Sequence, residues 1–227
     1  MTNAFAQKVR FLSPEQLDSA SMELLRKFAK SSGKPISPPI PIDEIIEKHL
    51  RVRLEFTDLK KKLGEDVLGA TWFDEGIIRV QQELEEQEGR LCFTMAHEAG
   101  HWVLHRPQYE ADKVTGQLFK RDSTEGPPAI VCRSSQRRQP AEWQADQFAA
   151  RVLMPEKFVR AAFAQVAGGE PVHVGPDGLT RFGWMRDLAA AVIAAGQFSN
   201  VSKDAMRIRL ETLELVARSD QASRRLL

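Results

Sequence analysis

One apolar stretch, LCFTMAHEAGHWVLH (Leu91–His105), constrains the fold more than any other part of the chain. Its apolar residues recur at helical spacing, and it carries two histidines four residues apart, His97 and His101. On an α-helix each residue turns by about 100°, so these two side chains project from the same face, one turn apart. The stretch therefore predicts a buried helix that begins near Gln87 and stops before Pro107, because proline cannot continue a helix interior.

The same spacing suits a divalent metal. Zn2+ binds imidazole nitrogens at roughly 2.0–2.1 Å, and a hydrolytic site needs three protein ligands and one open position. Glu98 lies beside the histidine pair, where it can act as a general base without occupying the metal. His105 is eight residues from His97, about 12 Å along a helix axis, and cannot join the same site. Because so short a pattern also arises by chance, the alternative is a set of histidines that only hydrogen-bond in a core.

The third ligand must come from another part of the chain. The segment PAEWQADQFAARVLMP (140–155) predicts a second helix, and Glu142 in its first turn is the predicted ligand. Asp146, one turn later on the same face, is predicted to accept the second N–H of a ligating histidine. The reverse assignment, with Asp146 as the ligand and Glu142 as its support, stays open. We expect Zn2+, with Mn2+ or Fe2+ as alternatives, because affinity depends on geometry and metal availability as well as ligand type.

A hydrolytic site also needs a group that stabilises a developing oxyanion. Tyr109, the only tyrosine in the chain, and His105 are the candidates, and the alternative is an ordinary surface tyrosine. An edge strand formed by VLGATWF (67–73) is expected to align an extended peptide by backbone pairing.

The region before the histidine-bearing helix predicts a small β-sheet. RVRLEFT (51–57) alternates apolar and charged residues, which is typical of a strand with one solvent face. VLGATWF and IIRVQQ (77–82) flank Asp74-Glu75-Gly76, which predicts a hairpin with glycine at a positive φ. We therefore predict an α+β fold, in which a small antiparallel or mixed sheet packs against the histidine-bearing helix and the third-ligand helix, with mostly helical N- and C-terminal regions.

Three regions are expected along the chain: an N-terminal helical segment with a proline-rich strap (1–45), a core (46–165), and a helical, helix-turn-helix-like C-terminal region (166–227). In the first region, residues 13–33 predict an amphipathic helix capped by Ser13, and Asp43 is expected to cap a second, short helix.

Two further segments carry expectations about local structure. Residues 108–139 are polar and interrupted by glycine and proline, which predicts a long loop. The last region is expected to hold two helices, at 182–196 and 202–219.

Net charge and cysteine content limit the cellular compartment and the kinds of partner that can be expected. The chain has 32 basic and 31 acidic residues, so it has no basic footprint, and direct nucleic-acid binding is not expected. Two cysteines outside any CxxC spacing, Cys92 and Cys132, predict a reducing compartment, the cytoplasm. No run approaches the roughly 18 apolar residues of a membrane span, and the N-terminus lacks a signal-peptide core, so neither membrane insertion nor secretion is expected.

Four segments, in order along the chain, resemble the ImmA/IrrE family of metallopeptidases: PIDEIIEKH (41–49), RLCFTMAHEAGHWVLH (90–105), EWQADQFAARVLMP (142–155) and FSNVSKDAMRIRLETLEL (198–215). The resemblance covers most of residues 40–215. It implies a gluzincin-like, intracellular zinc protease that cuts a helix-turn-helix repressor to release transcription, under stress or when a mobile element is induced. It also implies His97 and His101 as histidine ligands, Glu98 as the catalytic glutamate and Glu142 as the acidic ligand.

Three functional classes follow from these observations. The first is an endopeptidase that cleaves a regulatory protein, a helix-turn-helix repressor or antitoxin. The second is a scaffold that sequesters such a protein without cutting it, although sequestration would not need Glu98. The third is a DNA-binding regulator that uses its last helices, but acidic residues interleave with the basic ones there, which favours a packing or docking role. The interleaved residues are Lys203, Asp204, Arg207, Arg209, Glu211 and Glu214.

Overall fold

The computed structural model describes residues 9–114, 128–133, 139–175 and 179–218. These residues form two units, and each is described by itself. The first unit holds the described residues up to Pro35 and from Pro41 to Val152, and the second holds Ile36–Ile40 and the described residues from Leu153 onward. The helix of the predicted N-terminal segment lies in the first unit, and the predicted core region 46–165 is divided between the two.

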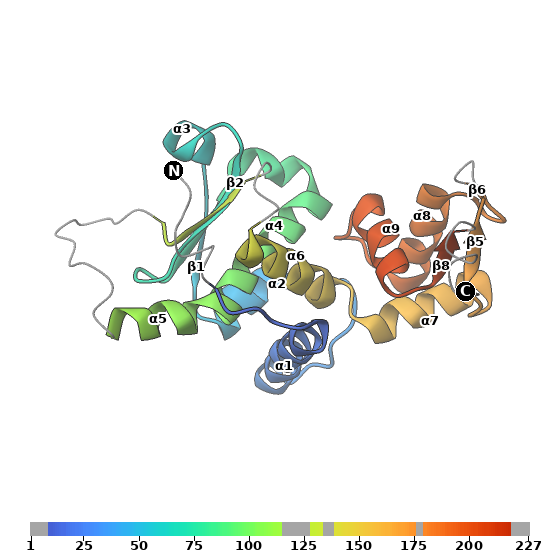
Figure 1. The fold of residues 1–227 in the computed structure, drawn as a ribbon, viewed down its shortest axis with the longest axis horizontal. Coiled ribbons are helices and arrows are strands. Elements are labelled where there is room, and N and C mark those ends of the chain that lie inside the picture. Colours follow the sequence, from blue (N-terminus) through green and yellow to red (C-terminus); the bar gives the residue numbers. More distant parts are fainter. Residues whose placement is uncertain (1–8, 115–127, 134–138, 176–178, 219–227) are drawn as a thin grey trace. The chain divides into compact units, whose positions relative to one another are not determined.

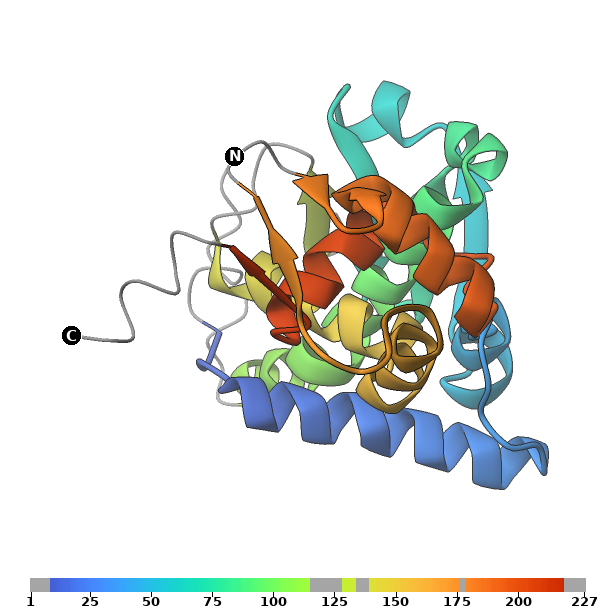
Figure 2. The same ribbon diagram turned by 90° about the vertical axis from the view of Figure 1, so that its right-hand side faces the viewer.

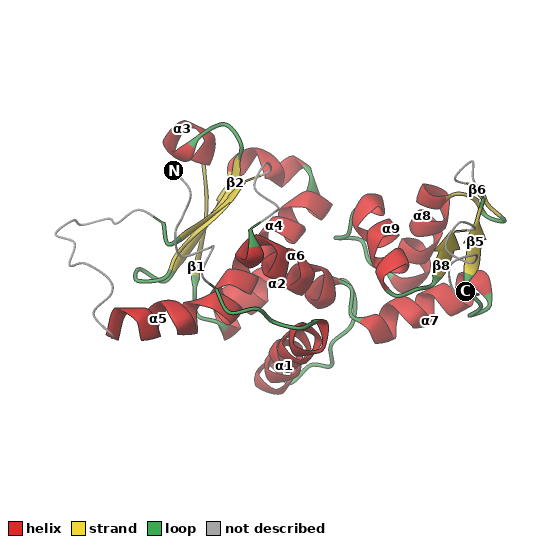
Figure 3. Ribbon diagram, in the orientation of Figure 1, coloured by secondary structure: helices red, strands yellow, loops and turns green. Residues whose placement is uncertain are grey.

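The first unit is built on one mixed sheet. Its four strands among the described residues have the order β1-β3-β2-β4. Figures 1 and 3 show the sheet, with β1 and β2 labelled. They are β1 (Arg53–Thr57), β2 (Val67–Trp72), β3 (Ile77–Gln81) and β4 (Ile130–Arg133). β1 is parallel to β3, whereas β2 is antiparallel to both β3 and β4. The predicted α+β class and mixed sheet are confirmed.

The predicted hairpin is present, but the role expected for its first strand is wrong. Trp72 pairs with Ile77, and Gly76 adopts φ +67° in the turn, as predicted. However, β2 is paired on both sides, so it offers no edge to a peptide. The edges among the described strands are β1 and β4, and β4 is the edge strand next to β2. Local pattern could not reveal this, because β4 comes from a distant segment.

Part of the predicted loop 108–139 is regular structure. Its first residues belong to α5 (Arg106–Val114), and β4 lies further along. Residues 115–127 and 134–138 are outside the described residues. The glycines and prolines of this segment predicted a loop, but the residues before and after them form the end of α5 and the four-residue strand β4.

Helices cover both faces of the sheet. On one face, α3 (Leu59–Leu63) packs through a buried apolar cluster. The members of this cluster are Leu59, Val67, Ala70, Trp72 and Ile77. On the other face, α4 (Glu88–Gly100) contacts β2 and β3. Because a strand alternates its side chains between faces, Gly69 and Thr71 of β2 point toward α4 while Ala70 and Trp72 point toward α3.

The histidine-bearing helix starts where predicted but does not end there. A short 3₁₀ helix, η2 (Gln82–Glu86), leads into α4, and Gln87 is the N-cap residue. The helix then continues through one π-helical segment, η3 (His101–His105), directly into α5. The backbone N–H of Arg106 bonds to the carbonyl of His101, five residues back. This wider turn places Pro107 in the first turn of α5, where a proline needs no amide hydrogen, so the helix passes through it.

The first helix, α1 (Pro14–Ser32), agrees with its prediction and is the long blue helix of Figure 2. Ser13 caps it by accepting a hydrogen bond from the Gln16 backbone N–H, and Gly33 ends it at φ +70°. The second helix differs. It begins at Ile42 and consists of α2 (Ile42–Glu44) and the π-helical η1 (Ile45–His49). The predicted cap, Asp43, lies inside its first turn, and no side chain caps this helix.

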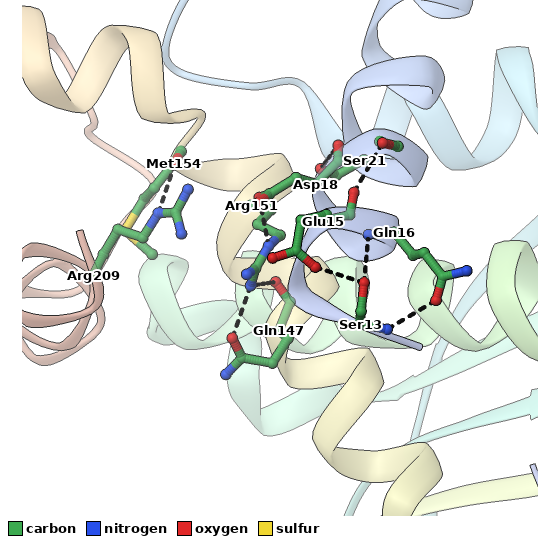
Figure 4. A network of polar contacts seen from close by, with 10 residues as sticks. Ser13, Glu15, Gln16, Asp18, Ser21, Gln147, Arg151, Met154 and Arg209 are labelled. Carbon is green, nitrogen blue, oxygen red and sulfur yellow. Dashed lines mark hydrogen bonds and ion pairs between the residues drawn. The ribbon is translucent and has the colours of Figure 1, made fainter. Parts of the chain in front are cut away.

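The third-ligand helix, α6 (Pro140–Leu153), is fixed to α1 by an ion pair. Arg151 donates from Nε to Asp18 Oδ1 at 2.6 Å, and its Nη1 donates to the side chain and the carbonyl of Gln147 (Figure 4). Arg151 is buried, whereas the Asp18 side chain is half exposed. The pair therefore orients α6 more than it stabilises the fold, because solvent screens one partner.

A glycine lets α4 and α6 approach closely. A Cβ at Gly100 would lie 3.3 Å from Ala145 Cα and 3.2 Å from Phe148 Cδ1. Ala145 and Phe148 are fully buried. Any side chain at position 100 therefore requires Ala145 or Phe148 to shift by a few tenths of an ångström.

The described residues of the second unit form three helices: α7 (Glu156–Ala167), α8 (Met185–Gly196) and α9 (Lys203–Thr212). They also form four short strands, β5 (Val172–Val174), β6 (Leu179–Thr180), β7 (Gly183–Trp184) and β8 (Val216–Arg218). β5 and β8 are parallel, and β6 and β7 form a small hairpin. The side-chain amide of Asn200 donates to the Ile40 carbonyl at 2.8 Å, which ties the proline-rich segment to this unit.

The prediction of a last helix over 202–219 is wrong beyond Thr212. Glu214 adopts a left-handed conformation at φ +54°, and the chain then enters β8. Tertiary pairing with β5 decides this segment, whose periodicity alone favours a longer helix. Arg209 is buried and donates to the Met154 carbonyl (Figure 4), so it is not available to a DNA backbone.

The close approach of α4 and α6 makes position 100 sensitive to side-chain size. We expect Gly100→Val to lower the free energy of unfolding by about 1–3 kcal/mol, because the added methyl groups overlap Ala145 and Phe148. Urea denaturation measures this. Ala111→Val adds two carbons, one fewer than Gly100→Val, at an exposed position of α5 and should change stability by less than about 0.5 kcal/mol. Equal stability of both variants would contradict the packing argument.

Candidate metal centre

Three side chains from two helices converge on one point. His97 and His101 come from the α4–η3 helix, and Glu142 comes from the first turn of α6. The two Nε2 atoms are 2.9 Å apart, His97 Nε2 is 3.3 Å from Glu142 Oε2, and His101 Nε2 is 3.3 Å from Glu142 Oε1. All three residues are buried. Two ligands of a tetrahedral zinc ion lie about 3.3 Å apart, so this spacing fits one divalent cation.

The charge of the group also suits a cation. Burial by itself raises the pKa of Glu142, but the adjacent His101 and His97 outweigh burial and hold its pKa well below the usual range. The carboxyl is therefore an anion at neutral pH. Two imidazole nitrogens and one carboxylate form a donor set that accepts zinc, iron or manganese.

Asp146 lies behind His97. Its Oδ1 is 2.9 Å from His97 Nδ1, the ring nitrogen that faces away from the point of convergence. In this arrangement Asp146 accepts the Nδ1–H proton and leaves the Nε2 lone pair for a metal. The geometry agrees with Glu142 as the ligand and Asp146 as the partner of a ligating histidine. The reverse assignment would need Asp146 beside the two Nε2 atoms, but Asp146 lies on the far side of the His97 ring.

His105 has the corresponding place behind His101. The two Nδ1 atoms are 2.9 Å apart, and His105 Nε2 is 3.1 Å from Gln144 Oε1. Gln144 in turn donates to the carbonyl of Arg10. Burial lowers the pKa of His105 to about 3, so this ring is neutral. It therefore accepts from His101 Nδ1–H and donates to Gln144, which again leaves an Nε2 lone pair for a metal.

This geometry argues against the oxyanion role expected for His105, because both of its ring nitrogens are engaged. The spacing of His101 and His105 could have suggested the contact between them. Gln144 was missed, since no sequence pattern distinguishes it from the other polar residues of its helix.

Tyr109 lies on α5, where its hydroxyl donates to Asp74 Oδ2 at 3.0 Å. Its ring packs edge-on against Phe73, with 5.1 Å between the ring centroids. The structure thus places Tyr109 against the β2–β3 turn. Its role as an oxyanion stabiliser stays a prediction.

Glu98 is held beside the convergence point by β2. The Thr71 hydroxyl donates to Glu98 Oε2 at 2.6 Å, whereas Glu98 Oε1 has no hydrogen-bond partner among the described residues. A Cβ at Gly69 would lie 2.5 Å from that oxygen, so the glycine makes room for the carboxylate. Burial raises the pKa of Glu98, against an opposing effect of His101 and His97. One oxygen is thus fixed and the other is free to take a proton.

Cys132 of β4 joins this cluster, which the sequence did not predict. The ligand atoms of His97, Cys132 and Glu142 all lie within 4.8 Å of one another. Cys132 lies in a segment whose composition predicts a loop, and the sequence has no neighbouring cysteine or histidine at metal-ligand spacing. No local signal could have found it, because tertiary pairing with β2 brings it to the site.

Comparison with known proteins adds one finding. The family profile of the IrrE N-terminal-like domain, a peptidase family, matches residues 47–170, which is more than half of the chain. The matched range contains α4, β4 and α6 and so includes every residue of the cluster. No curated protein has significant similarity to the chain. Within the described residues, no helix combines the length and the apolar character that a membrane crossing requires.

If Asp146 orients His97 as a metal ligand, its removal should weaken metal binding without unfolding the protein. We expect Asp146→Ala to lower zinc affinity on the order of 10–100-fold, since His97 loses the partner that fixes its tautomer. Competition with a chromophoric chelator measures the affinity. Glu75→Ala removes an exposed carboxylate from the β2–β3 turn and should bind zinc as the unchanged protein does. The orienting role fails if both variants retain full affinity.

Proposed function

The chain belongs to the IrrE N-terminal-like family of peptidases, and on that premise we propose that it is a metal-dependent endopeptidase that cleaves a regulatory protein. The observation that carries the proposal is the convergence of His97 Nε2, His101 Nε2 and the Glu142 carboxylate beside a buried glutamate with one free oxygen. These three residues are the proposed metal ligands, and Glu98 is the proposed catalytic base. Zn2+ is the proposed metal, with Mn2+ or Fe2+ as alternatives.

A divalent metal at this point would act as a Lewis acid that polarises the scissile carbonyl and acidifies a water molecule. Glu98 would take a proton from that water at Oε1 and later deliver it to the leaving amine. Burial raises its pKa, which favours the protonated form that delivers a proton to the leaving amine. The hydrogen bond from Thr71 to Oε2 holds the Glu98 carboxylate in place, which fixes the orientation of the free oxygen Oε1.

The substrate is proposed to pair with β4. An extended peptide can add to the edge of a sheet through its backbone, and β4 takes the place that the sequence had given to β2. β4 also borders the cluster through Cys132, so a peptide paired along this strand runs beside the ligands. A helix-turn-helix transcriptional repressor or antitoxin is the proposed substrate, as implied by the family resemblance, and the cytoplasm is the proposed location.

Two other functions receive less support. A scaffold that only sequesters a repressor has no use for a buried carboxylate held by Thr71 with one oxygen unpartnered within the described residues. A DNA-binding regulator would need the basic residues of α9, but Arg207 forms an ion pair with Glu211, and Arg209 is buried against the Met154 carbonyl. Direct nucleic-acid binding is therefore not part of the proposal.

Replacing the proposed base separates catalysis from metal binding. We expect Glu98→Gln to bind zinc normally and to lose cleavage by on the order of 10²–10⁴-fold, because the amide cannot accept the proton of the water. The assay incubates the zinc-loaded protein with any helix-turn-helix protein encoded beside its gene and looks for two fragments on a gel.

The control and the alternatives give distinct results in the same assay. Glu85→Gln changes an exposed glutamate and should cleave normally. A stable complex without fragments would favour sequestration, and unchanged turnover by Glu98→Gln would remove Glu98 from the mechanism.

A further inference from the structure

Cys132 lies on the sheet face that carries the metal cluster. It is the Cα partner of Gly69 in the β2–β4 ladder, and paired residues in antiparallel strands point to the same face. Gly69 has no side chain, and the space above it holds the free Oε1 of Glu98. The thiol of Cys132 and the free oxygen of Glu98 therefore lie on two sides of one small region. The proposed ligands on the helices bound the same region.

The thiol is close enough to share a metal with two of the proposed ligands. The ligand atoms of Cys132, His97 and Glu142 lie within 4.8 Å of one another. A sulfur and a nitrogen on one tetrahedral zinc ion are about 3.6 Å apart, given bond lengths of roughly 2.3 Å and 2.0–2.1 Å. This separation lies within the 4.8 Å limit, and the Cys132 thiol already forms a side-chain hydrogen bond with His97.

A fully buried carboxylate oxygen without a partner is the second observation at this place. Glu98 Oε1 has no hydrogen-bond partner among the described residues, and such a group is costly unless something else occupies the space beside it. It therefore marks a position where a bound species belongs, on the same side as the thiol.

We propose that Cys132 is a fourth metal ligand, whose thiolate occupies the coordination position that hydrolysis needs for water. This inference rests on the proposed peptidase function and adds its regulation. Metal binding displaces the thiol proton to solvent and forms a metal–sulfur bond. The resting protein then holds a closed site with four protein ligands, which is the arrangement of a structural rather than a catalytic zinc site. A thiolate also favours zinc over manganese in the choice of metal.

The closed site makes β4 the part that must move. Cys132 sits in a four-residue edge strand that pairs with one described neighbour, β2. The proposed ligands His97, His101 and Glu142 lie on long helices instead. Displacement of β4, or capture of the thiol by an electrophile, breaks the metal–sulfur bond and leaves the other three ligands in place. The proposed substrate strand and the proposed inhibitory ligand therefore belong to one element.

Cobalt substitution tests the ligand set without reference to activity. The Co2+-loaded protein should show a thiolate-to-cobalt charge-transfer band in the near ultraviolet. Cys132→Ala should lose this band and keep the visible bands of bound cobalt. Cys92→Ala is the matched control, because the chain has only two cysteines and Cys92 is buried in α4, outside the cluster. Chelator competition should show zinc affinity lower by about tenfold or more in Cys132→Ala, as expected for loss of a ligand.

Cleavage supplies an independent readout. Cys132→Ala, and the Cys92→Ala variant alkylated by iodoacetamide before metal is added, should both cut the repressor faster than the untreated protein. Alkylation forms a sulfur–carbon bond, releases iodide and prevents the thiol from binding metal.

The outcomes separate this proposal from the peptidase function. Bound cobalt without the charge-transfer band, or a band that persists in Cys132→Ala, overturns the thiolate ligand even if the repressor is cleaved. A band that depends on Cys132, combined with no cleavage by any variant, supports the ligand and overturns the peptidase function.

Discussion

The approach of α4 to α6 is the contact on which the rest of the site depends. Gly100 lies against Ala145 and Phe148 without a side chain of its own, and this contact sets the separation between the helix with both histidines and the helix with Glu142. A Cβ at position 100 would press on both residues, so the size of this side chain bears on the separation of the groups that now lie 3.3 Å apart. The ion pair between Arg151 and Asp18 orients α6. Packing at Gly100 and this ion pair together bring the Glu142 carboxylate to the histidines.

A second requirement is the satisfaction of many buried polar groups around the histidines. Each of the two rings proposed as ligands has a partner for its far nitrogen: Asp146 for His97, and His105 followed by Gln144 for His101. These partners fix the tautomers so that both Nε2 lone pairs face the same point. On the opposite side, Thr71 and Gly69 of β2 hold and accommodate Glu98. The proposed ligands thus come from helices, while the sheet supports the proposed base and carries the proposed inhibitory thiol.

Much of this arrangement could be predicted because it depends on local spacing. The pair His97 and His101 lies on one helical face by the geometry of the α-helix, and Glu142 and Asp146 lie one turn apart for the same reason. The predictions that were wrong depend on partners distant in sequence. Pro107 does not end its helix because a π turn precedes it, and β2 is not an edge because β4 pairs with it. The end of α9 follows from the pairing of β8 with β5, which a helical periodicity cannot reveal.

The sequence by itself determined the α+β class, the helix that carries both histidines and Glu98, and the helix that offers an acidic ligand, because each follows from a period of 3.6 or 2 within a short window. Only the tertiary structure decided which face of the sheet meets that helix. It also decided that His105 accepts a hydrogen bond from His101 and that Cys132 lies beside His97 and Glu142. The physical reason is that ligand sites are made by convergence of side chains from separate elements. Convergence depends on how closely those elements pack, and at Gly100 and Gly69 that distance is set by the absence of a single carbon atom.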